Sequence, residues 1–187
     1  MRGPPRSPDR RHFLRCSAAL GFTLCVADAE AQDDPREQRP TAGDRLVLAD
    51  GSGTPAPLRV GDVLADAGKP IVAVPYDVAG NTLRDGSKLN RLLLLRLAGD
   101  ASPATQGVVA FSAICTHEAC AVSEWSAAEQ RLLCPCHFSK FDVRDGGSVV
   151  EGPAPRNLPH LPLRLEAGDE LVVDGGFSAQ PGVRRNA

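Results

Sequence analysis

Short apolar runs separated by glycine, proline and aspartate recur through the middle and the end of the chain. The runs at 71–74, 92–97 and 108–114 are almost continuously apolar, while 161–165 alternates apolar and other residues. Runs of this length, bounded by turn-forming residues, are typical of β-strands. The pattern therefore predicts a chain built mainly from short strands.

Weaker segments extend the same pattern. Apolar residues at 131–133 and 138–143 predict two more strands, and residues 167–170 predict a hairpin turn into a strand at 171–173. Short strands at regular spacing favour an all-β antiparallel sandwich or barrel. The remaining predictions are a strand at 46–48, a helix at 60–67 and a loop at 83–88.

Composition supports this picture and excludes one class of function. The 187 residues suggest one domain with short extras, long enough to bury a core without the help of a metal. With 16 Pro and 18 Gly the chain has many turns. A net charge of −2 and a pI of about 6.1 argue against nucleic-acid binding, which needs a basic face.

The first 31 residues differ from the rest of the chain. Arg10 and Arg11 precede a mildly apolar stretch at 16–27, and small residues then alternate up to Ala31. These three features in order resemble a twin-arginine signal peptide at 1–31, which predicts cleavage near Ala31 and a periplasmic product. Twelve apolar residues are short for a membrane span, which needs about 20. A retained membrane anchor and an N-terminal amphipathic helix are the alternatives.

The chain after the leader divides into two parts. Residues 32–57 are rich in Pro, Asp, Arg and Gly and read as an extended arm, and residues 58–187 read as the folded domain. After residue 31 there are 16 Lys and Arg against 20 Asp and Glu, a net charge of −4. An acidic surface favours a partner with a basic docking patch, although ordinary solubility is the simpler explanation of the charge.

The candidate chemistry lies in one window of the chain. Cys115 and His117 form a Cys-x-His box, and Cys134 and His137 form a Cys-x-x-His box after 16 intervening residues. Two loops of this kind, brought together, make a four-ligand metal pocket. Cysteine and histidine at short spacing also suit zinc, and an exported protein could use its cysteines for structural disulfides alone. The residues by themselves leave these alternatives open.

Together the two boxes resemble those of Rieske proteins, which bind a [2Fe–2S] cluster. The resemblance is strong over 115–141 and implies that Cys115 and Cys134 bind one iron while His117 and His137 bind the other. It also implies a Rieske-type β fold with a small cluster-binding subdomain of two loops, at about 108–160. The extra cysteines, Cys120 and Cys136, match a pair that forms a disulfide in one branch of this family.

Four residues near the boxes are expected to tune the cluster. Ser139 stands where the family often has a hydroxyl that donates to a bridging sulfide. Phe141 replaces the tyrosine of high-potential cytochrome bc members, and Glu118 replaces an apolar residue, so both predict a lower potential. Phe138 replaces a glycine common in that branch and is expected to add cover.

A proline-rich segment follows the second box. Residues 152–158, with Pro153 and Pro155, resemble the loop that shields the cluster in cytochrome bc Rieske proteins. The prolines would keep such a loop rigid against the cluster. A plain connection between strands is the alternative.

The resemblance implies one-electron transfer, in a subunit of an oxidoreductase complex rather than a catalyst on its own. The run at 136–142 resembles the small subunit of arsenite oxidase, which predicts a larger catalytic subunit and a c-type cytochrome as redox partners. The quinol-oxidising subunit of a cytochrome bc complex, membrane-associated through an uncleaved leader, is one alternative. An exported structural or binding domain with zinc or disulfides only is the alternative from another class.

Overall fold

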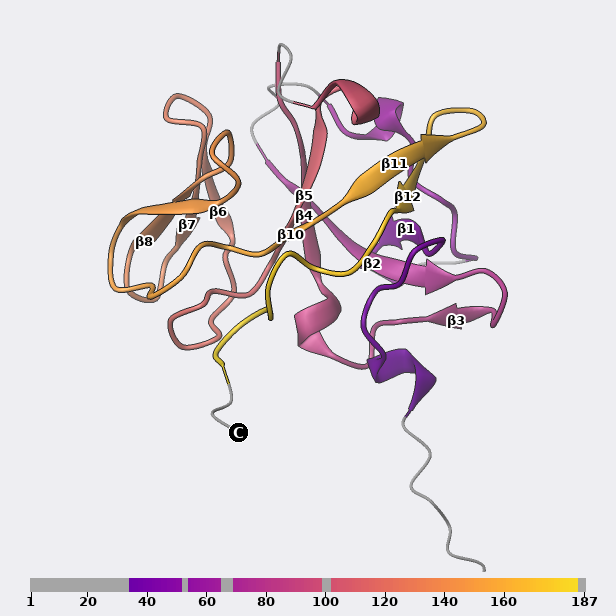
Figure 1. The fold of residues 1–187 in the computed structure, drawn as a ribbon, viewed down its shortest axis with the longest axis horizontal. Coiled ribbons are helices and arrows are strands. Elements are labelled where there is room, and N and C mark those ends of the chain that lie inside the picture. The colour runs from indigo at the N-terminus through magenta and orange to yellow at the C-terminus, as the bar shows by residue number, and fades with distance from the viewer. Residues whose placement is uncertain (1–33, 52–53, 65–68, 99–101, 185–187) are drawn as a thin grey trace, which may run out of the picture. The chain divides into compact units, whose positions relative to one another are not determined.

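Antiparallel strands account for nearly all of the regular structure in the computed structural model of this chain (Figure 1). The structure describes residues 34–51, 54–64, 69–98 and 102–184. The signal peptide predicted at 1–31 lies outside these residues. Within them, the all-β fold expected from the apolar pattern is confirmed.

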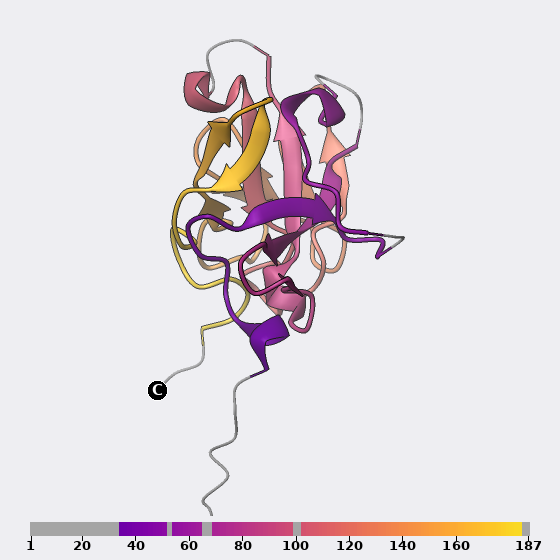
Figure 2. The same ribbon diagram turned by 90° about the vertical axis from the view of Figure 1, so that its right-hand side faces the viewer.

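A large sheet of eight strands forms the scaffold. Its order is β10-β5-β4-β2-β1-β12-β11, with β3 paired to β2. The edge strands β10 and β11 are consecutive in the chain and separated only by Pro162, so the sheet curls until its edges nearly meet. Figure 2 shows this sheet from a second side. Its strands are β1 (Arg45–Leu48), β2 (Ile71–Asp77), β3 (Thr82–Leu83), β4 (Leu92–Arg96), β5 (Val108–Ser112), β10 (His160–Leu161), β11 (Leu163–Glu166) and β12 (Glu170–Val173).

A small sheet is inserted between two neighbouring strands of the large one. The chain leaves the large sheet after β5 and returns in β10, and these two strands pair with each other. Between them the small sheet has the order β6-β7-β8-β9 and lies beside the large sheet (Figure 1). Its strands are β6 (Glu124–Ser126), β7 (Arg131–Cys134), β8 (Ser139–Asp142) and β9 (Ser148–Glu151).

Two apolar cores explain the continuous leucine run of β4. Leu92 and Leu94 belong to the core inside the large sheet, whereas Leu93 and Leu95 belong to a second core against the small sheet. A strand buried on both faces needs apolar residues at every position, since its side chains alternate between the faces. The second core also contains Cys115 and Cys134, which are each 1% exposed.

Helical structure among the described residues is limited to 3-10 turns of three residues. The prediction of a helix at 60–67 is wrong for its described part, where only the three-residue turn η3 is helical. Gly61 lies within this turn, and glycine is a poor helix former. No described helix is long and apolar enough to cross a membrane. The turns are η2 (Pro35–Glu37), η3 (Val60–Asp62), η4 (Lys88–Asn90) and η5 (Pro103–Thr105).

Candidate metal centre

Two loops of matching backbone geometry carry the candidate ligands. The first loop (115–120) follows β5, and the second loop (134–138) joins β7 to β8. In each loop the carbonyl of the first cysteine accepts a hydrogen bond from the N–H four residues later, at 3.2 Å from Ala119 and 2.9 Å from Phe138. Both donors lie in the left-handed region, with φ of 55° and 60°. Each loop is therefore a tight turn. The disulfide and the pair of histidines described below show that side chains of the two loops face each other.

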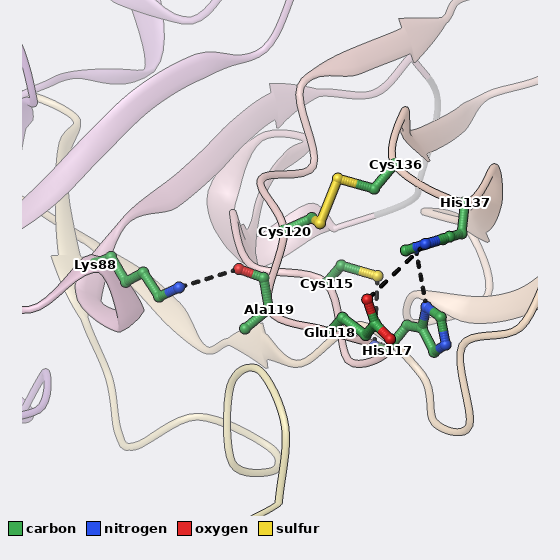
Figure 3. Close-up of a disulfide and its surroundings, with 8 residues drawn as sticks. All are labelled: Lys88, Cys115, His117, Glu118, Ala119, Cys120, Cys136 and His137. Carbon is green, nitrogen blue, oxygen red and sulfur yellow. Dashed lines mark hydrogen bonds and ion pairs between the residues drawn. A yellow bond between two sulfur atoms is a disulfide. The ribbon is translucent and has the colours of Figure 1, made fainter.

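A disulfide joins the two loops. It links Cys120 of the first loop to Cys136 of the second, the pair that the sequence resemblance implied (Figure 3). The sequence separation is 16 residues, and the Cα atoms lie 6.5 Å apart. This bond limits how far the loops can separate.

The other two cysteines of the described residues, Cys115 and Cys134, are free and buried. Burial raises the pKa of the Cys115 thiol above its ordinary value, and the nearby Cys134 thiol raises it further. Two hydrogen bonds oppose this rise in the pKa of Cys115, one from the His117 N–H at 3.5 Å and one from Ser139. Because metals bind the thiolate, metal binding at this site would release protons.

The two histidines meet at the outer side of this pair. The Nδ1 atom of His117 lies 3.2 Å from the Nδ1 atom of His137, and the rings are nearly perpendicular at 88° (Figure 3). The His137 side chain is 46% exposed, so the imidazoles lie between the buried sulfurs and the solvent. The carboxylate of Glu118 lies 3.9 Å from Nε2 of His137 and is itself 63% exposed.

This donor set fits a binuclear iron–sulfur cluster. Two buried thiols lie on the inside, two imidazoles present the same nitrogen from opposite loops, and the disulfide holds the loops together. Two cysteines on one iron and two histidines on the other are the ligands of a Rieske [2Fe–2S] centre. The donor atoms that lie within 4.8 Å of one another, as the ligands of a single tetrahedral ion do, keep His117 and His137 (with Glu118) in one group and place Cys134 in another. The four donors therefore fit two metal positions better than one zinc ion.

Ser139 and Phe141 lie on β8, which directly follows the second loop. The Ser139 side chain is fully buried, and its Oγ accepts a hydrogen bond from the Ala154 N–H at 3.1 Å. Its own proton stays available for the Cys115 sulfur. Phe141 is also fully buried, in the core that contains both free cysteines. Phe138, which is expected to add cover over the cluster, is 65% exposed next to His137 in the chain.

The proline-rich segment (152–158) packs against both loops. Gly152 has φ of +88° and approaches the backbone of Ser139 so closely that a Cβ would lie 2.5 Å from the Ser139 Cα. The Thr116 hydroxyl of the first loop donates to the carbonyl of Arg156 at 2.6 Å. Pro153 and Pro155 stay exposed on the outer surface of the segment.

Sequence reasoning missed three residues that hold this arrangement. Thr116 and Arg156 join the first loop to the proline-rich segment, and the Arg156 guanidinium also donates to the carbonyl of Gly182 at 2.6 Å. Lys88 of η4 donates to the carbonyl of Ala119 at 3.2 Å (Figure 3). These contacts join segments that are far apart in the chain, so no local sequence motif predicts them.

Comparison with known proteins places these features in context. The model of the Rieske [2Fe-2S] domain matches residues 77–162. A Haloferax mediterranei protein described as a respiratory nitrate reductase Rieske subunit is 35% identical over 187 residues, covering 92% of this chain and 80% of the relative. The cytochrome bc1 complex Rieske iron-sulfur subunit of Corynebacterium efficiens is 47% identical over 68 residues, covering 36% of this chain and 17% of the relative.

Among solved structures, the soluble domain of the Rieske protein II from Sulfolobus acidocaldarius is 31% identical with a TM-score of 0.39. That alignment covers 44% of this chain and 48% of the other. The chain therefore matches the nitrate reductase relative over most of both sequences, whereas it spans less than a fifth of the corynebacterial subunit.

Proposed function

The chain belongs to the Rieske [2Fe–2S] family, and on that premise we propose that it is the exported electron-transfer subunit of a periplasmic oxidoreductase. As a Rieske iron–sulfur protein it carries electrons and uses a [2Fe–2S] cluster. We assign Cys115 and Cys134 to one iron, and His117 and His137 to the other. Two observations support this assignment: Cys115 and Cys134 are free, buried thiols, and the Nδ1 atoms of His117 and His137 lie 3.2 Å from each other. A disulfide joins the two loops that carry these four residues.

A bound cluster would supply one-electron transfer at this position. The chain supplies the environment: Cys115 and Cys134 lie in the apolar core, which excludes water from the inner side. His117 and His137 replace two thiolates with neutral donors, which raises the reduction potential. Because the His137 ring is 46% exposed, the histidine side is the exit for the electron toward a partner.

Export is supported by the leader and by the disulfide. The twin-arginine pattern at 1–31 predicts passage across the membrane, and a disulfide between Cys120 and Cys136 persists in an oxidising compartment. We propose a larger catalytic subunit as the electron donor and a c-type cytochrome as the acceptor. The Haloferax relative, described as a nitrate reductase subunit, supports a complex with a catalytic subunit. It does not support the direction of electron flow, because nitrate reduction consumes electrons.

A second candidate is the quinol-oxidising Rieske subunit of a cytochrome bc complex. Its support is the 47% identity to the Corynebacterium efficiens subunit over 68 residues. Glu118 and Phe141 weigh against it, because a carboxylate beside His137 and the loss of a phenolic donor both disfavour the high potential of those members. A domain with zinc or disulfides only is set aside, since the cofactor of this family is a [2Fe–2S] cluster.

The ligand assignment is tested with the purified chain reduced by ascorbate. The wild type is expected to contain two iron atoms per chain and to give the rhombic electron paramagnetic resonance signal of a His-ligated cluster. His137→Ala should lose both. The control is His160→Ala, an exposed histidine on β10 outside the loops, which should keep them. Normal iron and signal in His137→Ala would overturn the assignment.

Export is tested separately by expressing the full chain and fractionating the cells. Wild-type protein should reach the periplasm and begin near Gln32, whereas replacing Arg10 and Arg11 by lysine should retain it in the cytoplasm. Lysine at Arg2 and Arg6 is the matched control. Export that is unaffected by the first pair would contradict the twin-arginine prediction.

A further inference from the structure

A groove of about 500 Å³ lies beside the first loop, outside the metal centre. Val72 of β2 and Leu93 of β4 form one side. Ile114, Ala119 and Val122, in and around the first loop, form another. Val72, the second residue of β2, is 41% exposed, although it is a large apolar residue. Leu93, Ile114 and Val122 are only 2%, 4% and 2% exposed, so Val72 contributes most of the apolar surface that is open to the groove.

The charged side chains that line this groove are all positive. Lys69, Lys88 and Arg91 line it, and its lining contains no Asp or Glu among the described residues. The chain as a whole has a net charge of −2, so three cations without a neighbouring acid are a local departure from its composition.

These cations are also available for a ligand. The side chains of Lys69 and Arg91 make no hydrogen bond or ion pair that involves another described residue, and the Lys88 ammonium makes one, to the carbonyl of Ala119 at 3.2 Å. An ammonium has three donors, so Lys88 can keep that bond and still bind an anion. The positive charges therefore lie at the edge of an apolar surface with most of their donors unused.

We propose that this groove binds a free amphiphilic carboxylate, with the anionic head at Lys88 and Arg91 and the alkyl or aromatic body against Val72 and Leu93. The volume lies in the range of small-molecule sites, about 300–1,000 Å³, rather than that of a flat protein interface. Burial of the body removes apolar surface from water at about 25 cal/mol per Å². The cations supply the charge complementarity that selects an anion over a neutral amphiphile.

The probe for this site is decanoate below its micelle-forming concentration, titrated into the holoprotein by calorimetry. We expect one site with a Kd below about 1 mM. Val72→Asp places a carboxylate on the apolar side and should weaken binding by about tenfold or more. The matched control is Val150→Asp, because Val150 is also a strand valine and is 43% exposed, but lies on β9 away from the groove. It should bind as the wild type does.

A second variant keeps the test informative if Val72→Asp fails to fold. Arg91→Gln removes one charge from the groove with little change in bulk and should weaken decanoate binding severalfold. No binding to the wild type, or equal losses in Val72→Asp and Val150→Asp, would overturn the proposal. Equal affinity for decanol and decanoate would overturn the role of the cations. A further outcome would overturn the proposal in favour of a membrane surface. In that case the wild type would sediment with anionic phosphatidylglycerol vesicles but not bind decanoate, and Val72→Asp would abolish the sedimentation.

Discussion

Gly152 is the point at which the proline-rich segment comes closest to the second loop, and Gly152→Ala should be strongly destabilising. A Cβ at this position would lie 2.5 Å from the Ser139 Cα and 2.8 Å from the Ser139 N, both backbone atoms that cannot rotate away. The φ of +88° adds strain for any L side chain. Left-handed backbone costs about 1–2 kcal/mol and overpacking about 1–3 kcal/mol, so the expected loss is about 2–5 kcal/mol.

Gly146 offers a control at the other end of β9. Its φ is +59°, yet a Cβ there meets nothing within 4 Å. Gly146→Ala should therefore lose only the backbone part, about 1–2 kcal/mol. The difference in unfolding free energy between the two variants measures the steric cost of a Cβ between the proline-rich segment and Ser139. We expect this difference to be about 1–3 kcal/mol.

Urea unfolding followed by far-ultraviolet circular dichroism measures both losses. With a slope of about 1–3 kcal/mol per molar urea, the midpoint of Gly152→Ala should fall below that of Gly146→Ala by about 1 M. The visible circular dichroism of the bound cluster should change in Gly152→Ala alone, because the clash displaces Ser139 beneath the second loop. Equal midpoints and equal spectra in the two variants would refute the close approach.

Three further substitutions test other contacts of the site. Ser139→Ala leaves the buried Ala154 N–H without its acceptor, so it should cost about 1–3 kcal/mol in unfolding free energy and lower the reduction potential measured by voltammetry. Replacing Cys120 and Cys136 together by serine removes a cross-link that closes a 16-residue separation, and should cost about 3 kcal/mol in the same unfolding measurement and speed loss of iron. Phe141→Tyr adds a phenolic donor to the core that holds the free cysteines and should raise the reduction potential. An unchanged or lower potential would contradict the expected hydrogen bond from this phenol to a cysteine sulfur.

The strands were predictable from sequence where burial leaves a clear pattern. The leucine run of β4 is continuous because both of its faces are buried, and its bounds, Leu92–Arg96, follow the predicted 92–97. Two strands of the small sheet were missed. β6 (Glu124–Ser126) and β9 (Ser148–Glu151) have no fully buried residue, so their sequences carry no apolar period and their pairing in the small sheet decides their structure.

The ligand boxes were visible in the sequence because the chemistry requires particular residues at short spacing. The residues that hold the boxes in place were not, because their contacts are long-range. Thr116 meets the carbonyl of Arg156 40 residues away, and Lys88 meets Ala119 31 residues away. A hydroxyl, a lysine and an arginine at these positions read as ordinary polar residues until the fold brings their partners to them.

The pairing of β5 with β10 has a consequence for how such a protein is put together. His160 lies opposite Phe111, so residues 113–159, which carry the whole metal centre, begin and end side by side on the scaffold. An insertion whose ends meet adds little strain to the host sheet and can lengthen or change internally without altering the strand order around it. Residues 113–159 can therefore vary in length without changing the strand order of the host sheet. A transplant of this segment into another barrel would also have to supply the apolar face that Leu93 and Leu95 present to it and the hydrogen bond from Lys88.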